Sequence, residues 1–269
     1  MIRLVSWNVA GRDLWGDLAG LEADVGLLQE APPPRPESAL HVLPEDLADW
    51  RTDGWRRACR TAVARLSDRV DIDPIPTVVV GESTGSRRPA ASRFGTVTIA
   101  DVKNGERVLL TVASVYAAWE GTRPGPIFAD GSAHRLLSDL APLMGSRTHR
   151  LVVAGDWNIL FGYGEHGDAY YRARYGTVFD RAEALGLEFV GPRHPGGRQA
   201  KPWPEELPTD SLCVPTYHTN RQTPATATRQ LDFVFASREL ADRISVRAMN
   251  AVEDWGPSDH CRVIIDIDP

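Results

Sequence analysis

The chain has 269 residues, of which 42% are hydrophobic and 25% charged, a composition typical of a globular protein with a large buried core. Its three cysteines lie far apart, no apolar stretch reaches the roughly 20 residues that span a bilayer, and no signal peptide precedes the first strand; we therefore expect no disulfide framework, zinc site or membrane anchor. The formal net charge of −6 argues against non-specific coating of nucleic acid, because that binding depends on basic side chains that neutralise phosphates.

Most predicted elements in the first half of the chain are strands. The buried runs IRLVSWN (2–8) and VGLLQE (25–30) each end on a polar residue, and the Pro-rich run APPPRPE after them is typical of a stiff loop. The runs FGTVTIAD (94–101) and VLLTVASVY (108–116) flank Asn104-Gly105, a dipeptide typical of hairpin turns. The second of these is apolar on both faces, which predicts a central strand.

The second half of the chain mixes helices and strands. Leucines at helical spacing predict a helix that Ser132 caps and Gly145 ends. The further predicted elements are a strand at 150–158 that breaks at Gly155, a helix at 177–186, and strands at 231–236 and 261–268, with long loops over 191–230. Helices between only some of the strands favour an α+β fold with a mixed or antiparallel sheet architecture rather than strict βαβ repetition, and we expect one domain over residues 1–269.

Polar side chains fall where these strands end. This set comprises Asn8, Glu30, Tyr116, Asp156, Asn158, Asp232, Asp259 and His260. Asp232 lies between apolar neighbours, where a carboxylate is costly unless it is paired or bound to a cation. Strand ends on one edge of a sheet can converge on one cleft, so these side chains are candidates for a single site.

The residue types suit hydrolysis of a phosphate ester. Asn8 and Glu30 supply the oxygen ligands that Mg²⁺ prefers. Asp156 can accept a proton from an attacking water, and Asn158 can help to hold that water and the phosphate. His260 can donate to a phosphate oxygen if a carboxylate raises its pKa.

Asp232 is the candidate for the carboxylate beside His260. The plainer alternative is an ion pair between Asp232 and Arg229.

Six motifs in chain order resemble the endonuclease/exonuclease/phosphatase superfamily, the fold of DNase I and of exonuclease-III-like apurinic endonucleases. They are SWNVAG, LLQE, SVY, GDWN, LDFVF and PSDH, and they extend from residue 6 to residue 260. The resemblance implies a four-layer α/β/β/α sandwich of two mostly antiparallel sheets with the site at one end. It also implies hydrolysis that depends on a divalent metal, Mg²⁺, for which Mn²⁺ is expected to substitute.

The same resemblance assigns roles to the residues. It places the metal on Asn8, Glu30 and Asp259. It assigns the scissile phosphate to Tyr116, the attacking water to Asp156 and Asn158, and the developing negative charge to His260, which Asp232 orients. Arg93, before the strand at 94–101, is a weaker candidate for a phosphate contact.

Two segments depart from the family pattern. Ala10 stands where apurinic endonucleases commonly carry an aspartate, which weakens the interpretation as a repair enzyme. The segment AAWEGTRPG after Tyr116 lacks the usual proline-containing continuation, so substrate contacts there are expected to differ.

The leading hypothesis is therefore a cytoplasmic, monomeric, Mg²⁺-dependent nuclease that acts on DNA or RNA and needs no protein partner. The sequence does not separate DNA from RNA, or endonuclease from exonuclease. An alternative is a phosphatase or phosphodiesterase acting on a small-molecule or lipid phosphoester. The third hypothesis is a non-catalytic binding module that keeps the fold.

Overall fold

The computed structural model describes residues 1–50, 60–79, 90–91, 95–121, 127–145 and 149–269. Two six-stranded sheets dominate these ranges, and each contains a single parallel pair of neighbouring strands in an otherwise antiparallel order. Two short two-stranded sheets accompany them, β6 (Val78–Val79) with β7 (Ala90–Ala91) and β10 (Glu120–Gly121) with β11 (Ile127–Phe128).

The first sheet contains both ends of the described chain. Its order is β15 (Ile244–Ala248), β16 (Val263–Ile267), β1 (Ile2–Asn8), β2 (Val25–Ala31), β4 (Arg60–Arg65) and β3 (His41–Leu43). The parallel pair is β1 and β2, so the ends of these two strands reach the same edge of the sheet.

The second sheet follows the same plan. Its order is β13 (Leu187–Gly191), β14 (Asp232–Ser237), β12 (Leu151–Asp156), β9 (Arg107–Tyr116), β8 (Val97–Asn104) and β5 (Asp71–Pro74). Here β9 and β12 are the parallel pair, and Asp156 lies in register with Tyr116. The predicted hairpin at Asn104-Gly105 is confirmed, because β8 and β9 pair on either side of it.

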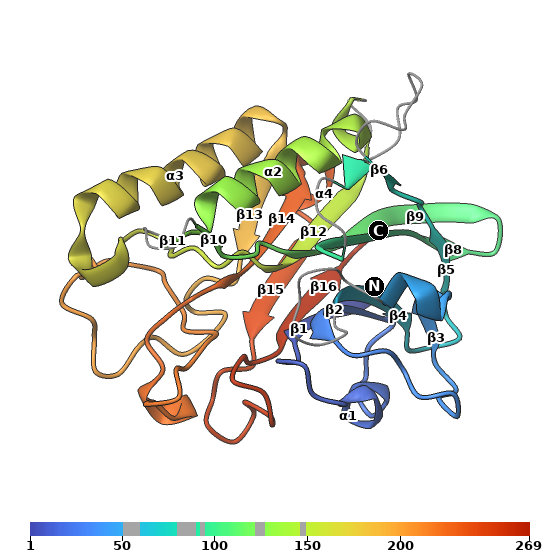
Figure 1. Ribbon diagram of the computed structural model, residues 1–269, viewed down its shortest axis with the longest axis horizontal. Coiled ribbons are helices and arrows are strands. Elements are labelled where there is room, and N and C mark those ends of the chain that lie inside the picture. The colour runs from blue at the N-terminus through green and yellow to red at the C-terminus, as the bar shows by residue number, and fades with distance from the viewer. Residues whose placement is uncertain (51–59, 80–89, 92–94, 122–126, 146–148) are drawn as a thin grey trace.

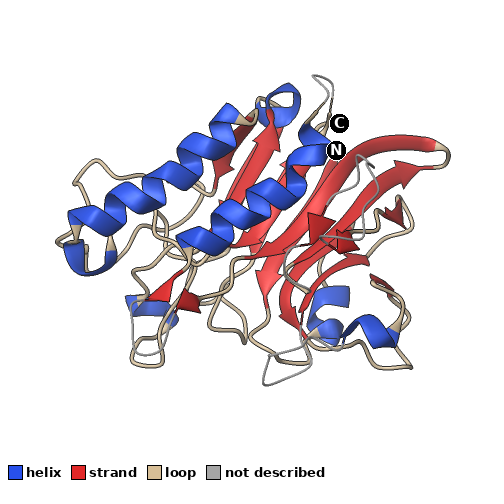
Figure 2. Ribbon diagram, turned by 45° about the horizontal axis from the view of Figure 1, so that its top comes forward, coloured by secondary structure: helices blue, strands red, loops and turns tan. Residues whose placement is uncertain are grey.

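Helices cover the outer faces of the two sheets. The α-helices are α1 (Trp15–Ala19), α2 (Asp130–Leu140), α3 (Ala169–Ala184) and α4 (Arg238–Ala241), and the 3₁₀ turns are η1 (Leu47–Trp50), η2 (Ala141–Met144), η3 (Glu165–Gly167) and η4 (Pro224–Thr226). Figure 2 shows α2 and α3 side by side over one sheet, and Figure 1 shows α1 on the opposite side of the molecule. None of the described helices is both long and apolar enough to traverse a lipid bilayer.

Three hydrophobic cores hold these layers together. The central core lies between the sheets, where Leu4 and Val25 of the first sheet pack with Val112 and Val152 of the second. One outer core packs α2 and α3 onto the second sheet, and the other packs Trp15 and its neighbours onto the first. Burial on both faces of each sheet explains the continuous apolar runs in the strands. The predicted α/β/β/α sandwich of mostly antiparallel sheets is confirmed.

Three predicted element boundaries were wrong. Helix α2 begins at Asp130, so Ser132 lies inside it and is not its cap, and the segment before Gly145 is the 3₁₀ turn η2. Helix α3 begins at Ala169 rather than at 177, because its first turns carry tyrosines and arginines instead of an apolar stripe; Asp168 caps it by accepting a hydrogen bond from the Tyr170 backbone N–H (2.8 Å). Strand β12 does not break at Gly155 but continues to Asp156.

Candidate active site

The strand register brings the predicted side chains together from both sheets. Asp156 at the end of β12 is paired with Tyr116 of β9 on one side and with Asp232 of β14 on the other. On the facing sheet, Asn8 ends β1 and lies one position from the register of Glu30 in β2. These five strands therefore present polar groups at one edge of the sandwich.

Asn8 joins the two sheets at this edge. Its Nδ2 donates hydrogen bonds to Asp156 Oδ2 (2.9 Å) and to Glu30 Oε1 (3.3 Å), and its Oδ1 accepts one from the Ala10 backbone N–H (2.9 Å). Asn8 is only 1% exposed, so these contacts lie in a medium of low polarity, where hydrogen bonds to charged groups are strong. The amide holds the carboxylate of one sheet at a fixed place relative to that of the other.

The backbone at this edge adopts conformations that side chains rarely accept. Glu30 and Asn158 both have φ of 49°, and Ala10 has φ of 52°. Non-glycine residues in the left-handed region cost about 1–3 kcal/mol each and concentrate at functional sites. The turn at Glu30 is fixed by the Gly11 backbone N–H, which donates to the Glu30 carbonyl (2.9 Å).

Gly155 allows β12 to lie close against β9. A Cβ atom at this position would lie 1.9 Å from the Val115 carbonyl oxygen. Only glycine fits, which explains the residue that suggested a break in the strand. The close approach sets Asp156 directly beside Tyr116.

His260 is held by Asp232. The two side chains are 4% and 2% exposed, and His260 Nδ1 lies 2.8 Å from Asp232 Oδ2. Burial alone would lower the pKa of His260, but the charges of Asp232 and Asp156 and the bond to Asp232 outweigh it and raise the pKa to about 10. His260 is thus an imidazolium at neutral pH, with Nε2 3.8 Å from Asp156 Oδ2. The alternative partner for Asp232 was wrong, because Arg229 pairs with Glu165 instead (2.9 Å).

Asp156 and Asn158 form a tight turn after β12. The Asn158 backbone N–H donates to Asp156 Oδ1 (2.9 Å), and Asn158 Nδ2 donates to the Ala117 carbonyl (3.0 Å) and to Asp156 Oδ2 (3.3 Å). Burial raises the pKa of Asp156 to about 7, although the neighbouring His260 charge opposes this effect. A carboxylate with a pKa near neutrality is a suitable proton acceptor.

Tyr116 lies beside Asp156 and contacts two other residues of the candidate site. Its half-buried phenol is hydrogen-bonded to Glu30 and to Asn158, and burial together with the charges of Glu30 and Asp156 raises its pKa well above the ordinary value. The phenol therefore stays neutral and remains a hydrogen-bond donor.

Three supporting residues were present in the motifs but received no role from sequence reasoning. Ser258 Oγ donates to the Asn8 carbonyl (2.7 Å) and accepts from the His260 backbone N–H (3.3 Å), which ties the His260 segment to β1. Gln29 Nε2 donates to Ser114 Oγ (3.0 Å) across the gap between the sheets. The sequence signal that could have identified Gln29 and Ser114 is a polar residue inside an apolar strand. Both are fully buried, and buried polar side chains need hydrogen-bond partners.

The donor set fits a hard divalent cation. The charges of Asp232, Asp156 and Asp259 raise the pKa of His260, and those of Asp232 and Glu30 raise the pKa of Asp156, a sign of repulsion among carboxylates that a cation would relieve. Within the described ranges, no three His, Cys, Asp or Glu side chains form a ready-made metal cluster. Mg²⁺ usually takes one or two carboxylates together with waters and substrate phosphate, and the partly exposed Glu30 and Asp259 offer such ligands.

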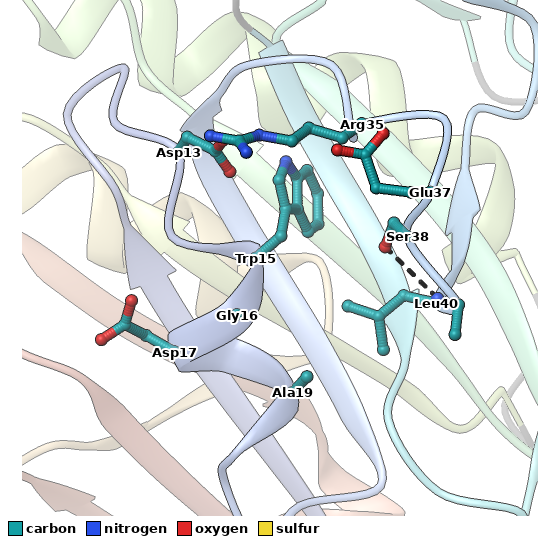
Figure 3. A pocket seen from close by; sticks show the side chains of 10 residues that line it. Asp13, Trp15, Gly16, Asp17, Ala19, Arg35, Glu37, Ser38 and Leu40 are labelled. Carbon is teal, nitrogen blue, oxygen red and sulfur yellow. Dashed lines mark hydrogen bonds and ion pairs between the residues drawn. The ribbon is translucent and has the colours of Figure 1, made fainter.

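Arg93 falls outside the described residues. A hollow of about 470 Å³ opens between the segment after β1 and the loop after β2, where the Arg35–Asp13 ion pair (2.5 Å) lies beside Trp15 (Figure 3). The candidate catalytic residues do not line this hollow.

The strand ends of this two-sheet sandwich present carboxylates, amides and a charged imidazole, which are groups that suit cleavage of phosphoesters. The model of the Endonuclease/Exonuclease/phosphatase family matches residues 5–260, and the chain belongs to this family. No curated protein matches the chain.

Solved structures share the fold over the whole chain. An AP endonuclease from Leishmania major has a TM-score of 0.65 at 16% identity, covering 100% of this chain and 88% of its own. The 3′ phosphatase NExo from Neisseria, bound to product DNA hairpin, has a TM-score of 0.62 at 18% identity, with 100% of both chains covered. An AP endonuclease from Archaeoglobus fulgidus has a TM-score of 0.63 at 16% identity, again with 100% of both chains covered. At these identities the likeness establishes the fold.

Proposed function

We propose that this chain is a Mg²⁺-dependent phosphodiesterase that hydrolyses nucleic acid. The observation that carries the proposal is the connected chain of side chains from Glu30 through Asn8 and Asp156 to His260 and Asp232, which spans both sheets. Structures of similar fold that are described as AP endonucleases and as a 3′ phosphatase with bound DNA support nucleic acid as the substrate class.

Glu30, Asn8 and Asp259 are the residues that would hold the metal. Glu30 and Asp259 are partly exposed at the edge, whereas Asp156 and Asp232 are buried, so the accessible carboxylates are the ones that an ion reaches first. When bound, the ion would neutralise negative charge on the phosphate and orient it for attack.

Asp156 and Asn158 act on the attacking water in this proposal. Asp156 accepts a proton from the water as its oxygen forms a bond to phosphorus, which is why a pKa near neutrality matters. The Asn158 amide, anchored on the Ala117 carbonyl, keeps the carboxylate in place.

His260 stabilises negative charge on the phosphate in this proposal. Its Nε2–H donates to a non-bridging phosphate oxygen, on which negative charge builds as the water attacks phosphorus, and Asp232 keeps the ring charged and correctly oriented. The phenol of Tyr116 donates to the same phosphate. The leaving oxygen takes a proton from solvent as its bond to phosphorus breaks, so the products are a phosphomonoester and an alcohol.

Cleavage of plasmid DNA, single-stranded DNA and RNA oligonucleotides tests the proposal. We expect hydrolysis with Mg²⁺ or Mn²⁺, none with EDTA, and a loss of about 10²–10³-fold or more for Asp156→Ala and for His260→Ala. Nucleotides and inositol phosphates serve as parallel substrates, and faster turnover of these would favour the small-phosphoester alternative. Activity that persists in EDTA, or in the double variant, would contradict the mechanism.

A further inference from the structure

Tyr217 is fixed directly beside His260 by backbone pairing. It lies in the loop before β14 and forms isolated antiparallel bridges with both Arg229 and His260. The Cys261 backbone N–H donates to the Thr216 carbonyl (2.9 Å), and the His218 backbone N–H donates to the Asp259 carbonyl (3.0 Å). Residues directly opposite in an antiparallel pair project to the same face, so Tyr217 shares the face of His260.

The two rings are in contact on that face. Their centroids are 4.8 Å apart with an angle of 46° between the planes. His260 and Asp156 are buried to 4% and 1% exposure, whereas Tyr217 is partly exposed. Because Tyr217 is more exposed than His260, a substrate that approaches the imidazole from the solvent would contact Tyr217 first.

The phenol of Tyr217 faces the same charges as the catalytic groups. Burial raises its pKa, and the charges of Asp259, Asp156 and Glu30 raise it further while that of Arg229 opposes them. A neutral phenol in this position is a hydrogen-bond donor, and its hydroxyl has no hydrogen-bond partner among the residues that the structure describes. The group is therefore a hydrogen-bond donor beside His260, on a partly exposed side chain of the candidate site.

We propose that Tyr217 is a further catalytic residue whose hydroxyl donates a hydrogen bond to a non-bridging oxygen of the scissile phosphate, on the side of His260. This assignment rests on the proposed function. It gives the phosphate a second phenol besides Tyr116.

A purely structural role for Tyr217 would be packing against His260. The variant Tyr217→Phe keeps the ring and this packing and removes only the hydroxyl. We expect kcat/KM to fall about tenfold or more, the usual effect of removing a hydrogen bond to a charged group, while the thermal midpoint stays unchanged. Tyr170→Phe is the matched control, since that tyrosine is 58% exposed on α3, and its activity should equal that of the wild type.

Phosphorothioate substrates identify the atom that is contacted. Sulfur is a weak hydrogen-bond acceptor, so replacement of the contacted oxygen should remove the advantage of the hydroxyl. We expect Tyr217→Phe to slow cleavage of the oxygen substrate and of one phosphorothioate diastereomer about tenfold, and to leave cleavage of the other diastereomer almost unchanged. Equal penalties on all three substrates, or no penalty on any, would overturn the proposal.

The proposed function and the role of Tyr217 can fail separately. Cleavage by the wild type together with loss in Asp156→Ala upholds the function whatever Tyr217→Phe does. If the wild type cleaves no phosphodiester, binding of a fluorescent oligonucleotide in the presence of Ca²⁺ tests whether Tyr217 contacts the phosphate. Severalfold weaker binding by Tyr217→Phe would support the contact, and equal binding, or no binding by either protein, would overturn it.

Discussion

The charge on His260 is set by its neighbours rather than by the imidazole itself. Burial favours the neutral ring, so the protonated form depends on the negative charge and hydrogen bond of Asp232, with Asp156 in second place. A group with a raised pKa is protonated below that pKa and loses its proton above it. The imidazolium therefore persists through neutral pH only while Asp232 is ionised.

The variant Asp232→Asn should lower the pKa of His260 well below its wild-type value of about 10, because burial then dominates. NMR titration of the histidine C–H resonances in metal-free protein measures this directly. At pH 8 the wild-type ring should be charged and the variant ring largely neutral, with kcat reduced about 100-fold or more.

Asp73→Asn is the control for that substitution, since it removes a carboxylate from a surface ion pair with Lys103. It should leave the His260 titration unchanged. A titration of His260 in Asp232→Asn that matches the wild type would show that Asp232 is not the source of the raised pKa.

The motifs predicted which side chains form the site but not how they connect. Asn8 was expected to offer its oxygen to a metal, which stays a prediction; its Nδ2, in addition, donates to Glu30 and Asp156 and links two sheets. A contact between residues 148 positions apart follows from the packing of the sheets and has no local pattern. Tyr217 was missed for the same reason, because its nearness to His260 arises from two isolated bridges in a long loop.

At the scale of elements, the close approach of β12 to β9 determines where the candidate catalytic groups Asp156 and Tyr116 lie. Asp156 and Tyr116 end these parallel strands in register, and Gly155 immediately before Asp156 allows the approach. A side chain there would have to separate the strands, because the obstacle is backbone. The position of Asp156 is thus coupled to a residue with no chemistry of its own.

Gly155→Ala should both destabilise the fold and reduce activity. The added Cβ would meet the Val115 carbonyl oxygen, and overpacking of this kind costs about 1–3 kcal/mol, occasionally more. A displacement of Asp156 by about 1 Å would cost about 100-fold in rate. Urea unfolding and kcat at saturating substrate measure the two effects.

Gly176→Ala provides the comparison, because a Cβ at this helical position meets nothing within 4 Å. It should leave activity unchanged and stabilise the protein by about 0.5–1 kcal/mol. Wild-type stability and rate in Gly155→Ala would mean that the strands separate at little cost.

The elements were predicted correctly where a strand is buried, because burial requires a recognisable run of apolar residues. Strand β1 and the hairpin of β8 and β9 are buried between layers, so their apolar runs and turn residues specify them. Helix α3 was predicted only in its second half because Tyr170, Arg172 and Arg174 lie in its exposed first turns. There the Asp168 cap and the ion pair of Arg174 with Asp130 on α2 (2.6 Å) fix the helix.

At the scale of the whole molecule, the site lies on the seam between the two sheets. Asn8 and Glu30 come from the first sheet and Asp156 and Asp232 from the second. The carboxylates repel one another, and the hydrogen bonds of Asn8 hold two of them together. A cation bound to the native arrangement alone would stabilise the whole sandwich, because unfolding scatters the ligands.

We therefore expect Mg²⁺ to raise the thermal midpoint of the wild type. At a free concentration of 100 times the dissociation constant, binding contributes about 2.7 kcal/mol, which corresponds to a shift of about 5–10 °C for a chain of this size. EDTA should reverse the shift. Calorimetry with and without 10 mM Mg²⁺ measures it.

Glu30→Gln separates metal binding from folding. It removes one of the repelling carboxylates, so without Mg²⁺ its midpoint should equal or exceed that of the wild type, while the shift with Mg²⁺ should be lost. Glu188→Gln, at an exposed ion pair on β13, should keep the full shift. If Glu30→Gln retains the shift, the ion is bound elsewhere. If the variant lowers the midpoint without Mg²⁺, Glu30 serves the fold rather than the metal, because a carboxylate whose role is to bind the metal can be removed from the metal-free protein without loss of stability.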